Sequence, residues 1–277
     1  MAVSQNSAQA DAVQACDPVW TQMRSEADGA VKAEPALGGF IFGNILGHEK
    51  LEIAVAHRVA QRLGSSDVDS RVIVDTFQKV LETAPRLAIA FRADLSAVYD
   101  RDPACARYME PMLYFKGFHA LVAYRFAHLL HDVGRKDLAF YLQSQSSRVF
   151  NVDIHPGARI GIGIMLDHAT GFVVGETAVV GDNCSFLHGV TLGGSGKETG
   201  DRHPKIADNV LIGAGAKVLG NITIGECSRV AAGSVVLKDV PRNVTVAGVP
   251  AKVVGPAGCP EPSRTMDQRF ESGDWTI

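Results

Sequence analysis

Apolar residues recur with two different periods along the chain, and the first is that of α-helices. Between residues 18 and 151 they follow the i, i+3, i+4 spacing of amphipathic helices. One pattern covers residues 118–130 and ends before Gly134, a residue that suits a helix C-terminal cap. Another covers residues 68–81 and follows Asp67, a candidate N-cap. Each apolar face needs a partner, so we predict a compact helical domain over residues 18–151.

The second period is six residues long and begins at residue 152. An apolar residue occupies every sixth position, apart from one slip of two residues and one longer interruption. These positions are Ile154, Ile160, Leu166, Val174, Val180, Phe186, Leu192, Ile206, Ile212, Val218, Ile224, Val230 and Val236. A second column of mostly small or β-branched residues, which includes Thr170 and Cys184, lies four positions after each apolar residue.

A unit of six residues is too short to bury its own apolar side chain. Such units must therefore stack as short parallel strands joined by turns, with three units to a coil and both columns facing the axis. We predict the fold class α + β, in which an N-terminal all-helical domain precedes a left-handed parallel β-helix, a solenoid of hexapeptide repeats, over residues 152–254. Residues 1–17 are expected to be disordered, and residues 255–277 to form a mobile tail.

The register of the repeats gives polar residues a direction. Asp167 and His168 follow the inward-facing Leu166 and should face outward, as should Asp153. Asp153 lies 15 residues before His168, close to one coil, so the carboxylate and the imidazole could meet on adjacent coils. Such a pair orients a histidine and stabilises the charge that it gains with a proton. The alternative is that both residues are merely solvated on the outside of the β-helix.

A long polar loop interrupts the repeat between Leu192 and Ile206, in the stretch GGSGKETGDRHPK. Loops of this kind in a regular solenoid are either functional or tolerated insertions. The loop covers residues 193–205. Arg202 and His203 precede a proline at its rigid end, which favours a functional role for the loop.

Glycine is the unusual feature of the composition. The chain has 28 glycines, of which 17 lie between Val152 and Val254. Several follow an inward aliphatic residue directly, where the chain must turn with positive φ or without side-chain crowding. These are Gly161, Gly175, Gly181, Gly213 and Gly225. The stretch GGSGKE lacks the Ser or Thr that a Walker A loop needs after its lysine, so nucleotide hydrolysis is not indicated.

Charge, cysteine and histidine spacing exclude several other classes. A net charge of −3 and 46% hydrophobic residues argue against a disordered chain and against a strongly basic nucleic-acid binder. We find no run of about 18 apolar residues and no export signal, which predicts a soluble protein without a membrane segment. The five scattered cysteines form no CxxC pair, which favours a reducing cytoplasm. Cys184 faces inward and is predicted to be a packed thiol rather than a nucleophile.

Four histidines in the repeat region raise the possibility of a metal site. They are His155, His168, His188 and His203, separated by 13, 20 and 15 residues. Zinc-binding β-helix enzymes of the gamma carbonic anhydrase class instead carry two histidines separated by four residues. We therefore predict no metal.

Three stretches together are highly specific: DIHP at 153–156, LDHATG within GIMLDHATG at 163–171, and GDRHPK within VTLGGSGKETGDRHPKI at 190–206. A fourth, RDPA at 101–104, lies upstream. With YFKGFHALVAYRFAH, they make residues 85–255 closely resemble the serine acetyltransferases, which make O-acetylserine for cysteine synthesis. The hexapeptide repeat alone is weaker, because many acyltransferases share it.

The resemblance implies roles for individual residues. His168 matches the general base and Asp153 the carboxylate that orients it. The residues that match the amino-acid site are Asp102 and Asp167, for the ammonium group, and Arg202 and His203, for the carboxylate. A guanidinium pairs bidentately with a carboxylate, so the second assignment is chemically sensible. The residues that match the acetyl-CoA surface are Gly194, Ser195, Ala214 and Ala232.

The resemblance also implies an activity and partners. Acetyl would pass directly from acetyl-CoA to the hydroxyl of L-serine, giving O-acetyl-L-serine and CoA without an acyl-enzyme. Members of the family are commonly inhibited by cysteine, which mimics serine, and form hexamers as dimers of trimers with active sites between neighbouring prisms. Their C-terminal isoleucine, here Ile277, inserts into O-acetylserine sulfhydrylase.

Two alternatives stay open. Another hexapeptide acetyltransferase, with a sugar or other hydroxyl or amine as acceptor, would share the base and the cofactor surface. It would not need Asp102, Asp167 and Arg202 to hold the charged ends of an amino acid. A binding module or scaffold would leave the outward-facing aspartate and histidine without a role.

Overall fold

The computed structural model describes residues 17–196 and 199–269, and the chain divides into two compact units, residues 1–157 and 158–277. Most of the predicted disordered N-terminus, and the predicted role of Ile277, therefore lie outside the described residues. Among the residues that are described, no helix is both long and apolar enough to cross a membrane.

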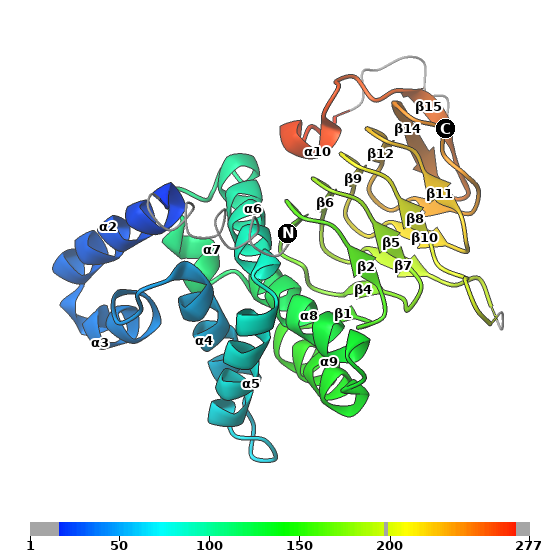
Figure 1. Cartoon of the computed structure of the whole chain (residues 1–277). Coiled ribbons are helices and arrows are strands. Elements are labelled where there is room, and N and C mark those ends of the chain that lie inside the picture. The colour runs from blue at the N-terminus through cyan, green and yellow to red at the C-terminus, as the bar shows by residue number, and fades with distance from the viewer. Residues whose placement is uncertain (1–16, 197–198, 270–277) are drawn as a thin grey trace, which may run out of the picture. The chain divides into compact units, whose positions relative to one another are not determined.

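Helices make up the first unit (Figure 1). They are α2 (Pro18–Ala33), the 3-10 helix η1 (Pro35–Leu37), α3 (Gly38–Ile41), the π-helix η2 (Phe42–Leu46), α4 (Leu51–Leu63), α5 (Ser70–Thr83), α6 (Arg86–Arg101), α7 (Met109–Leu113), α8 (Lys116–Asp132) and α9 (Lys136–Phe150), followed by the strand β1 (Val152–Ile154).

Helix α8 forms the centre of this unit. It covers the predicted segment 118–130, and Gly134 follows its end with a φ of 83°. It packs against α4, α5, α6, α7 and α9, which explains why most of its residues are buried. Its Phe126 stacks on Phe77 of α5, with ring centroids 3.7 Å apart. The apolar pattern therefore predicted this helix and its cap well.

Helix α5 begins later than the sequence predicts. Its N-cap is Asp69, whose side chain accepts a hydrogen bond from the backbone N–H of Arg71 at 2.8 Å. The prediction of Asp67 as the N-cap is wrong. Asp67 lies in the bend before the helix, where its own N–H donates to the Ser65 hydroxyl. Val72, which belongs to the predicted apolar pattern, is 53% exposed.

A buried ion pair joins α6 to α8. Both nitrogens of one edge of the Arg125 guanidinium donate to Asp94, at 2.7 Å and 2.9 Å. The Asp94 side chain is fully buried and that of Arg125 is 6% exposed. Since a lone charge is costly in such a place, the two residues must be kept together.

A neutral histidine is built into the same core. His119 is completely buried, and its Nε2 lies 2.7 Å from the carbonyl of Met112, to which it donates. Its Nδ1 lies 3.2 Å from a nitrogen of Arg62, which can only donate. Burial, with the hydrogen bond to Met112 acting in the opposite direction, lowers the pKa of His119 to about 3.

The buried histidine predicts a loss of stability in mild acid. Below about pH 6.5 the unfolded chain protonates this histidine, whereas the folded chain does not do so until about pH 3. Unfolding therefore takes up a proton in this window, so the free energy of unfolding falls as the pH decreases. Between pH 7 and pH 5 the loss from this residue should be about 2 kcal/mol. Urea unfolding of His119→Gln at both pH values should show a pH dependence smaller by this amount. The exposed His188→Gln serves as the control, and equal pH dependence in wild type and His119→Gln would contradict the prediction.

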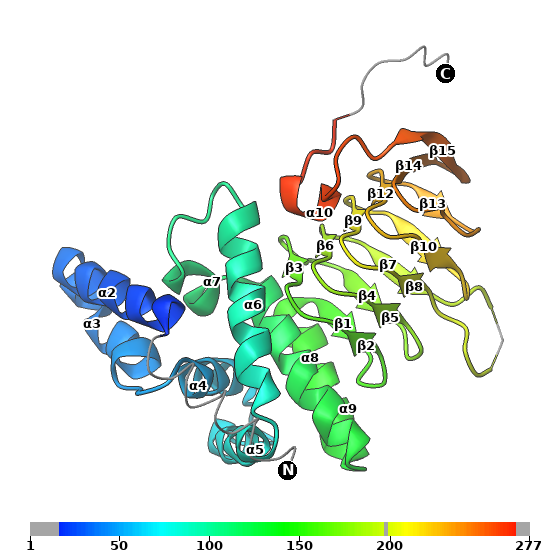
Figure 2. The ribbon, with the colours of Figure 1, turned by 45° about the horizontal axis from the view of Figure 1, so that its top comes forward.

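The second unit is a parallel β-helix, which confirms the predicted fold class (Figures 1 and 2). Its strands are β2 (Arg159–Ile160), β3 (Met165–Leu166), β4 (Phe172–Val174), β5 (Val179–Val180), β6 (Ser185–Phe186), β7 (Thr191–Gly193), β8 (Lys205–Ile206), β9 (Leu211–Ile212), β10 (Lys217–Leu219), β11 (Thr223–Ile224), β12 (Arg229–Val230), β13 (Val235–Val236), β14 (Val244–Gly248) and β15 (Ala251–Pro256). The short helix α10 (Pro262–Thr265) follows them.

Each strand stacks on the strand three earlier in the chain, except β14, which stacks on β12, so the three sides of the coil are three parallel sheets. Their orders are β4-β7-β10-β13, β2-β5-β8-β11 and β3-β6-β9-β12-β14. The hairpin partner β15 then runs antiparallel to β14 along the last edge (Figure 2). Of the thirteen residues in the predicted apolar column, all but Ile160 are buried. Cys184 is fully buried, and its thiol donates to the carbonyl of Ala207, as expected of a packed thiol.

The glycines that follow the aliphatic column are required by crowding rather than by positive φ. None of the five predicted positions has a positive φ. A Cβ atom added at Gly175 would lie 2.0 Å from the ring of His203, and one at Gly213 would lie 2.6 Å from the backbone of Ala232. Neighbouring coils therefore come too close at these corners for any side chain.

Candidate active site

One corner of the β-helix has a regular form on three successive coils. The strand ends Phe186, Ile212 and Val230 are in register with one another. Each is followed, three residues later, by a glycine whose φ is 70–71°. These glycines are Gly189, Gly215 and Gly233. The residues that project at this corner, directly before the glycines, are His188, Ala214 and Ala232.

The coil that carries the predicted base departs from this form. Leu166 is in register with Phe186, but its glycine, Gly171, follows five positions later rather than three. The two additional residues are His168 and Ala169, whose φ values of 52° and 56° are uncommon outside glycine. A two-residue insertion therefore pushes His168 out of the regular wall of the solenoid.

This insertion corrects one part of the predicted register. Thr170 was expected to face the axis, yet it is exposed, because it takes the place of His188 on the next coil. The hydrogen bonds agree: Gly189 donates to the carbonyl of Thr170 as Gly215 donates to that of His188, both at 2.8 Å. Phe172 fills the inward position instead. The slip of two residues in the sequence is thus the insertion that holds His168.

His168 points into solvent, as the register predicts. Its side chain is 78% exposed, and its Nε2 lies 3.8 Å from a carboxylate oxygen of the half-buried Asp167. Its ring also makes an edge contact with the ring of His188, with centroids 6.1 Å apart. The imidazole is therefore accessible to a substrate and has a carboxylate beside it.

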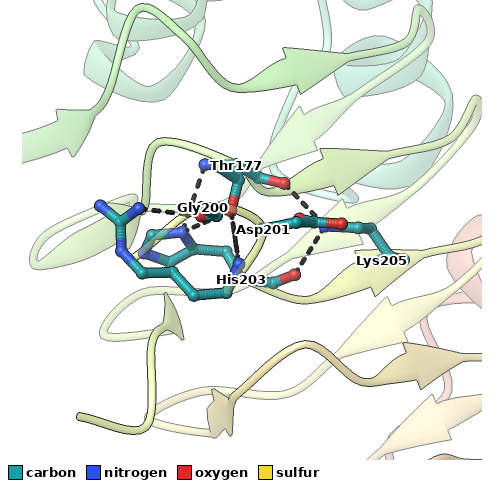
Figure 3. A network of polar contacts seen from close by, with 6 residues as sticks. Thr177, Gly200, Asp201, His203 and Lys205 are labelled. Carbon is teal, nitrogen blue, oxygen red and sulfur yellow. Dashed lines mark hydrogen bonds and ion pairs between the residues drawn. The ribbon is translucent and has the colours of Figure 1, made fainter. Parts of the chain in front are cut away.

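The long loop returns to the β-helix through a network centred on Thr177 (Figure 3). The Thr177 hydroxyl accepts the backbone N–H groups of Arg202 and His203, at 3.0 Å and 3.1 Å. The Nζ of Lys205 donates to the carbonyls of Thr177 and His203 and to the Asp201 carboxylate. The Lys205 hydrogen bond is the main cause that lowers the pKa of Asp201.

This network fixes the backbone of Arg202 and His203 to the turn that contains Thr177. The Arg202 guanidinium donates to Glu176 at 2.7 Å and to the carbonyl of Gly200 at 3.0 Å. Sequence reasoning did not single out Thr177 or Glu176. Threonine and glutamate are ordinary on the outside of a coil, so only their contact with a loop about 25 residues later distinguishes them.

Two of the predicted site residues belong to the first unit. Asp153 lies in β1 and accepts a hydrogen bond from the side-chain amide of Gln143 at 2.7 Å. This contact fixes the direction of the carboxylate, and it could not be read from the repeat because Gln143 belongs to α9. Asp102 directly follows α6, and its carboxylate accepts the backbone N–H of Ala104 at 2.8 Å.

The residues predicted to contact the cofactor share the outer surface of the second unit. Gly194 and Ser195 follow β7 at the start of the loop, while Ala214 and Ala232 occupy the regular corner described above. Ala232 lines a cavity of about 90 Å³ whose walls include Asp267 and Gln268. A guanidinium nitrogen of Arg229 holds this C-terminal segment by donating to the carbonyl of Asp267 at 2.8 Å.

Within residues 17–196 and 199–269, no group of three or more His, Cys, Asp or Glu side chains is arranged to hold a metal ion. The corner that carries His168, between the sheets of β3 and β4, presents an exposed imidazole beside a carboxylate. Arg202 and His203 lie at a different corner, between the sheets of β4 and β5, where Thr177 holds them.

Family models and relatives agree over most of the chain. The model described as "Serine acetyltransferase, N-terminal" matches residues 19–123, and that described as "Bacterial transferase hexapeptide (six repeats)" matches residues 203–238. A serine acetyltransferase of Salmonella typhimurium is 50% identical over 252 residues, which cover 91% of this chain and 92% of the relative.

Solved structures are similar over the same extent. The serine acetyltransferase of Brucella abortus in complex with coenzyme A is 59% identical, with a TM-score of 0.88, over 89% of this chain and 99% of that one. The Neisseria gonorrhoeae enzyme in complex with serine is 54% identical, with a TM-score of 0.84, over 86% and 97% of the two chains. A serine acetyltransferase in complex with cysteine is 45% identical, with a TM-score of 0.90, over 91% and 98%. The chain belongs to the serine acetyltransferase family.

Proposed function

We propose that this protein transfers acetyl from acetyl-CoA to the hydroxyl of L-serine, giving O-acetyl-L-serine and CoA, a step toward cysteine. The observation that carries the proposal is the insertion that presents His168 to solvent beside Asp167, in a chain 50% identical to a serine acetyltransferase. The complexes of relatives with coenzyme A and with serine support the choice of substrates.

In the proposed reaction, His168 is the general base. Serine's hydroxyl is a weak nucleophile at neutral pH, and an imidazole is the side chain best suited to take its proton there. The oxygen–carbon bond forms as the proton passes to His168, and the carbon–sulfur bond then breaks. The proton returns from the imidazolium to the CoA thiolate, so no covalent enzyme intermediate is needed. Asp153, held by Gln143, would orient the imidazole.

The charged ends of serine require groups of opposite charge. Asp102 and Asp167 would hold the ammonium group, while Arg202 and His203 would hold the carboxylate. Arg202 already donates to Glu176. A bound carboxylate would therefore have to share or replace this partner, which makes Glu176 a competitor for the guanidinium.

Acetyl-CoA would lie along the outer surface formed by Gly194, Ser195, Ala214 and Ala232, where the small side chains leave the backbone amides accessible. We also propose cysteine as an inhibitor that binds in place of serine, supported by the cysteine complex of a relative. The hexameric assembly and the binding of Ile277 to O-acetylserine sulfhydrylase stay part of the proposal, on the resemblance alone.

One assay tests the proposed function. Thiol release from acetyl-CoA should be fast with L-serine and close to background with homoserine, a galactoside or no acceptor. A sugar or amine acceptor that supports turnover as well as serine does would contradict the proposal and favour another hexapeptide acetyltransferase. Thiol release with none of these acceptors would leave a binding role as the better interpretation.

A further inference from the structure

The side chain of Thr177 joins two coils through a single oxygen atom. Thr177 lies in the turn before β5, and its Oγ1 accepts the N–H of Arg202 and the N–H of His203. Backbone N–H groups at a partly buried site need such acceptors, so this hydroxyl fixes the peptide units that carry both side chains. Loss of the hydroxyl would release two donors at once.

The backbone of Thr177 determines the tautomer of His203. Its N–H lies 3.2 Å from Nδ1 of His203, and an amide N–H can only donate. Nδ1 must therefore be the unprotonated nitrogen, and the ring proton lies on Nε2. The Thr177 hydroxyl lies 2.9 Å from the same Nδ1 and is compatible with this state whether its hydrogen points to His203 or to Asp201.

Gly175 fixes the ring from the other side. A Cβ atom at this position would lie 2.0 Å from both Nε2 and Cδ2 of His203, so the ring packs directly on the glycine backbone. His203 is 6% exposed and cannot easily turn over to exchange its nitrogens. Ring position and tautomer are thus determined by two residues of the same turn, Gly175 and Thr177.

We propose that Thr177 is a positioning residue, which holds His203 as a neutral imidazole that donates from Nε2 to the carboxylate of the amino-acid acceptor. Arg202, whose N–H is held by the same hydroxyl, supplies the positive charge. This inference rests on the proposed function and adds a residue to its acceptor site. It assigns carboxylate recognition to one cation and one neutral donor, both aligned by a threonine.

Kinetics of three variants test the positioning role. In Thr177→Val, which keeps the shape and the backbone N–H but removes the hydroxyl, the KM for serine should rise about 10- to 100-fold. The kcat should stay within about 3-fold, and the KM for acetyl-CoA should not change. Thr177→Ser should restore the KM for serine. Thr223→Val, at an exposed threonine of β11 in the same unit, should behave as the wild type.

Solid-state ¹⁵N NMR of imidazole-labelled protein tests the tautomer without using activity. The signals absent from His203→Gln identify this residue, and in the wild type they should show a protonated Nε2 and an unprotonated Nδ1 for the neutral ring. Thr177→Ser and Thr177→Val both keep the backbone N–H that donates to Nδ1, so both variants should keep this single tautomer.

A wild-type His203 protonated on Nδ1 would overturn the proposal. So would a Thr177→Val protein that loses kcat or acetyl-CoA affinity while its KM for serine is unchanged. If the wild type shows no turnover with serine, the proposed function itself fails. The spectra then decide alone whether Thr177 sets the His203 tautomer.

Discussion

Replacing His168 with alanine should lower kcat for acetyl transfer to serine by about 10²- to 10⁴-fold, the usual contribution of a general base. The substitution removes the imidazole that the corner insertion presents to solvent, but it leaves the inward neighbours Leu166 and Phe172 in place. The KM for acetyl-CoA should therefore change little. Steady-state thiol release with both substrates saturating measures the effect.

The matched control is His188→Ala. This second histidine contacts the ring of His168 and is also exposed, but it lies on the regular form of the corner. Its loss should change kcat by no more than a few fold. Near-normal turnover in His168→Ala, or an equal loss in both variants, would contradict the assignment of the base. Asp153→Asn should lower kcat while leaving acetyl-CoA binding intact.

Replacing Asp94 with alanine should destabilise the helical unit by about 3–5 kcal/mol, because it leaves the Arg125 guanidinium buried without its carboxylate. Both hydrogen bonds of the pair are lost at once, at a site where Asp94 is fully buried. Urea unfolding at pH 7, followed by far-UV circular dichroism, should show a lower midpoint for the transition of this unit.

Asp69→Ala is the control for this prediction. Asp69 also pairs with an arginine, Arg71, but both side chains are largely exposed, and water screens such pairs so that they contribute little to stability. Asp69 is in addition the N-cap of α5, which adds a modest cost to its replacement. An Asp94→Ala protein no less stable than Asp69→Ala would show that the buried pair contributes little.

Periodicity in the sequence was sufficient to predict the fold, because each hexad must place one apolar residue on the axis. It failed at Thr170, where two additional residues change the register locally without disturbing the next coil. The sequence shows that two residues are added to this repeat, but it does not show whether they lie before or after Thr170. Positive φ at His168 and Ala169 answers that question.

Only those residues of the candidate site that belong to a recognisable sequence motif could be predicted. The outward direction of His168 follows from the register, and Arg202 and His203 stand out in a polar loop. Thr177 was missed because its role depends on contacts with residues 25 and 26 positions later, across a loop of irregular length. The repeat predicts which residues meet on adjacent coils. It does not predict the conformation of the inserted loop, which depends on individual hydrogen bonds such as those to Thr177.

The antiparallel hairpin of β14 and β15 also limits how far this solenoid can extend. The last strand of a parallel sheet in a β-helix has a row of unpaired backbone N–H and C=O groups, and a strand of another molecule can pair with this edge. Here β15 covers that edge of the longest sheet with a strand of opposite direction. It carries the exposed Lys252 and ends at Pro256, two residue types that discourage further strand pairing. This edge of the longest sheet is thus protected from pairing with a strand of another molecule.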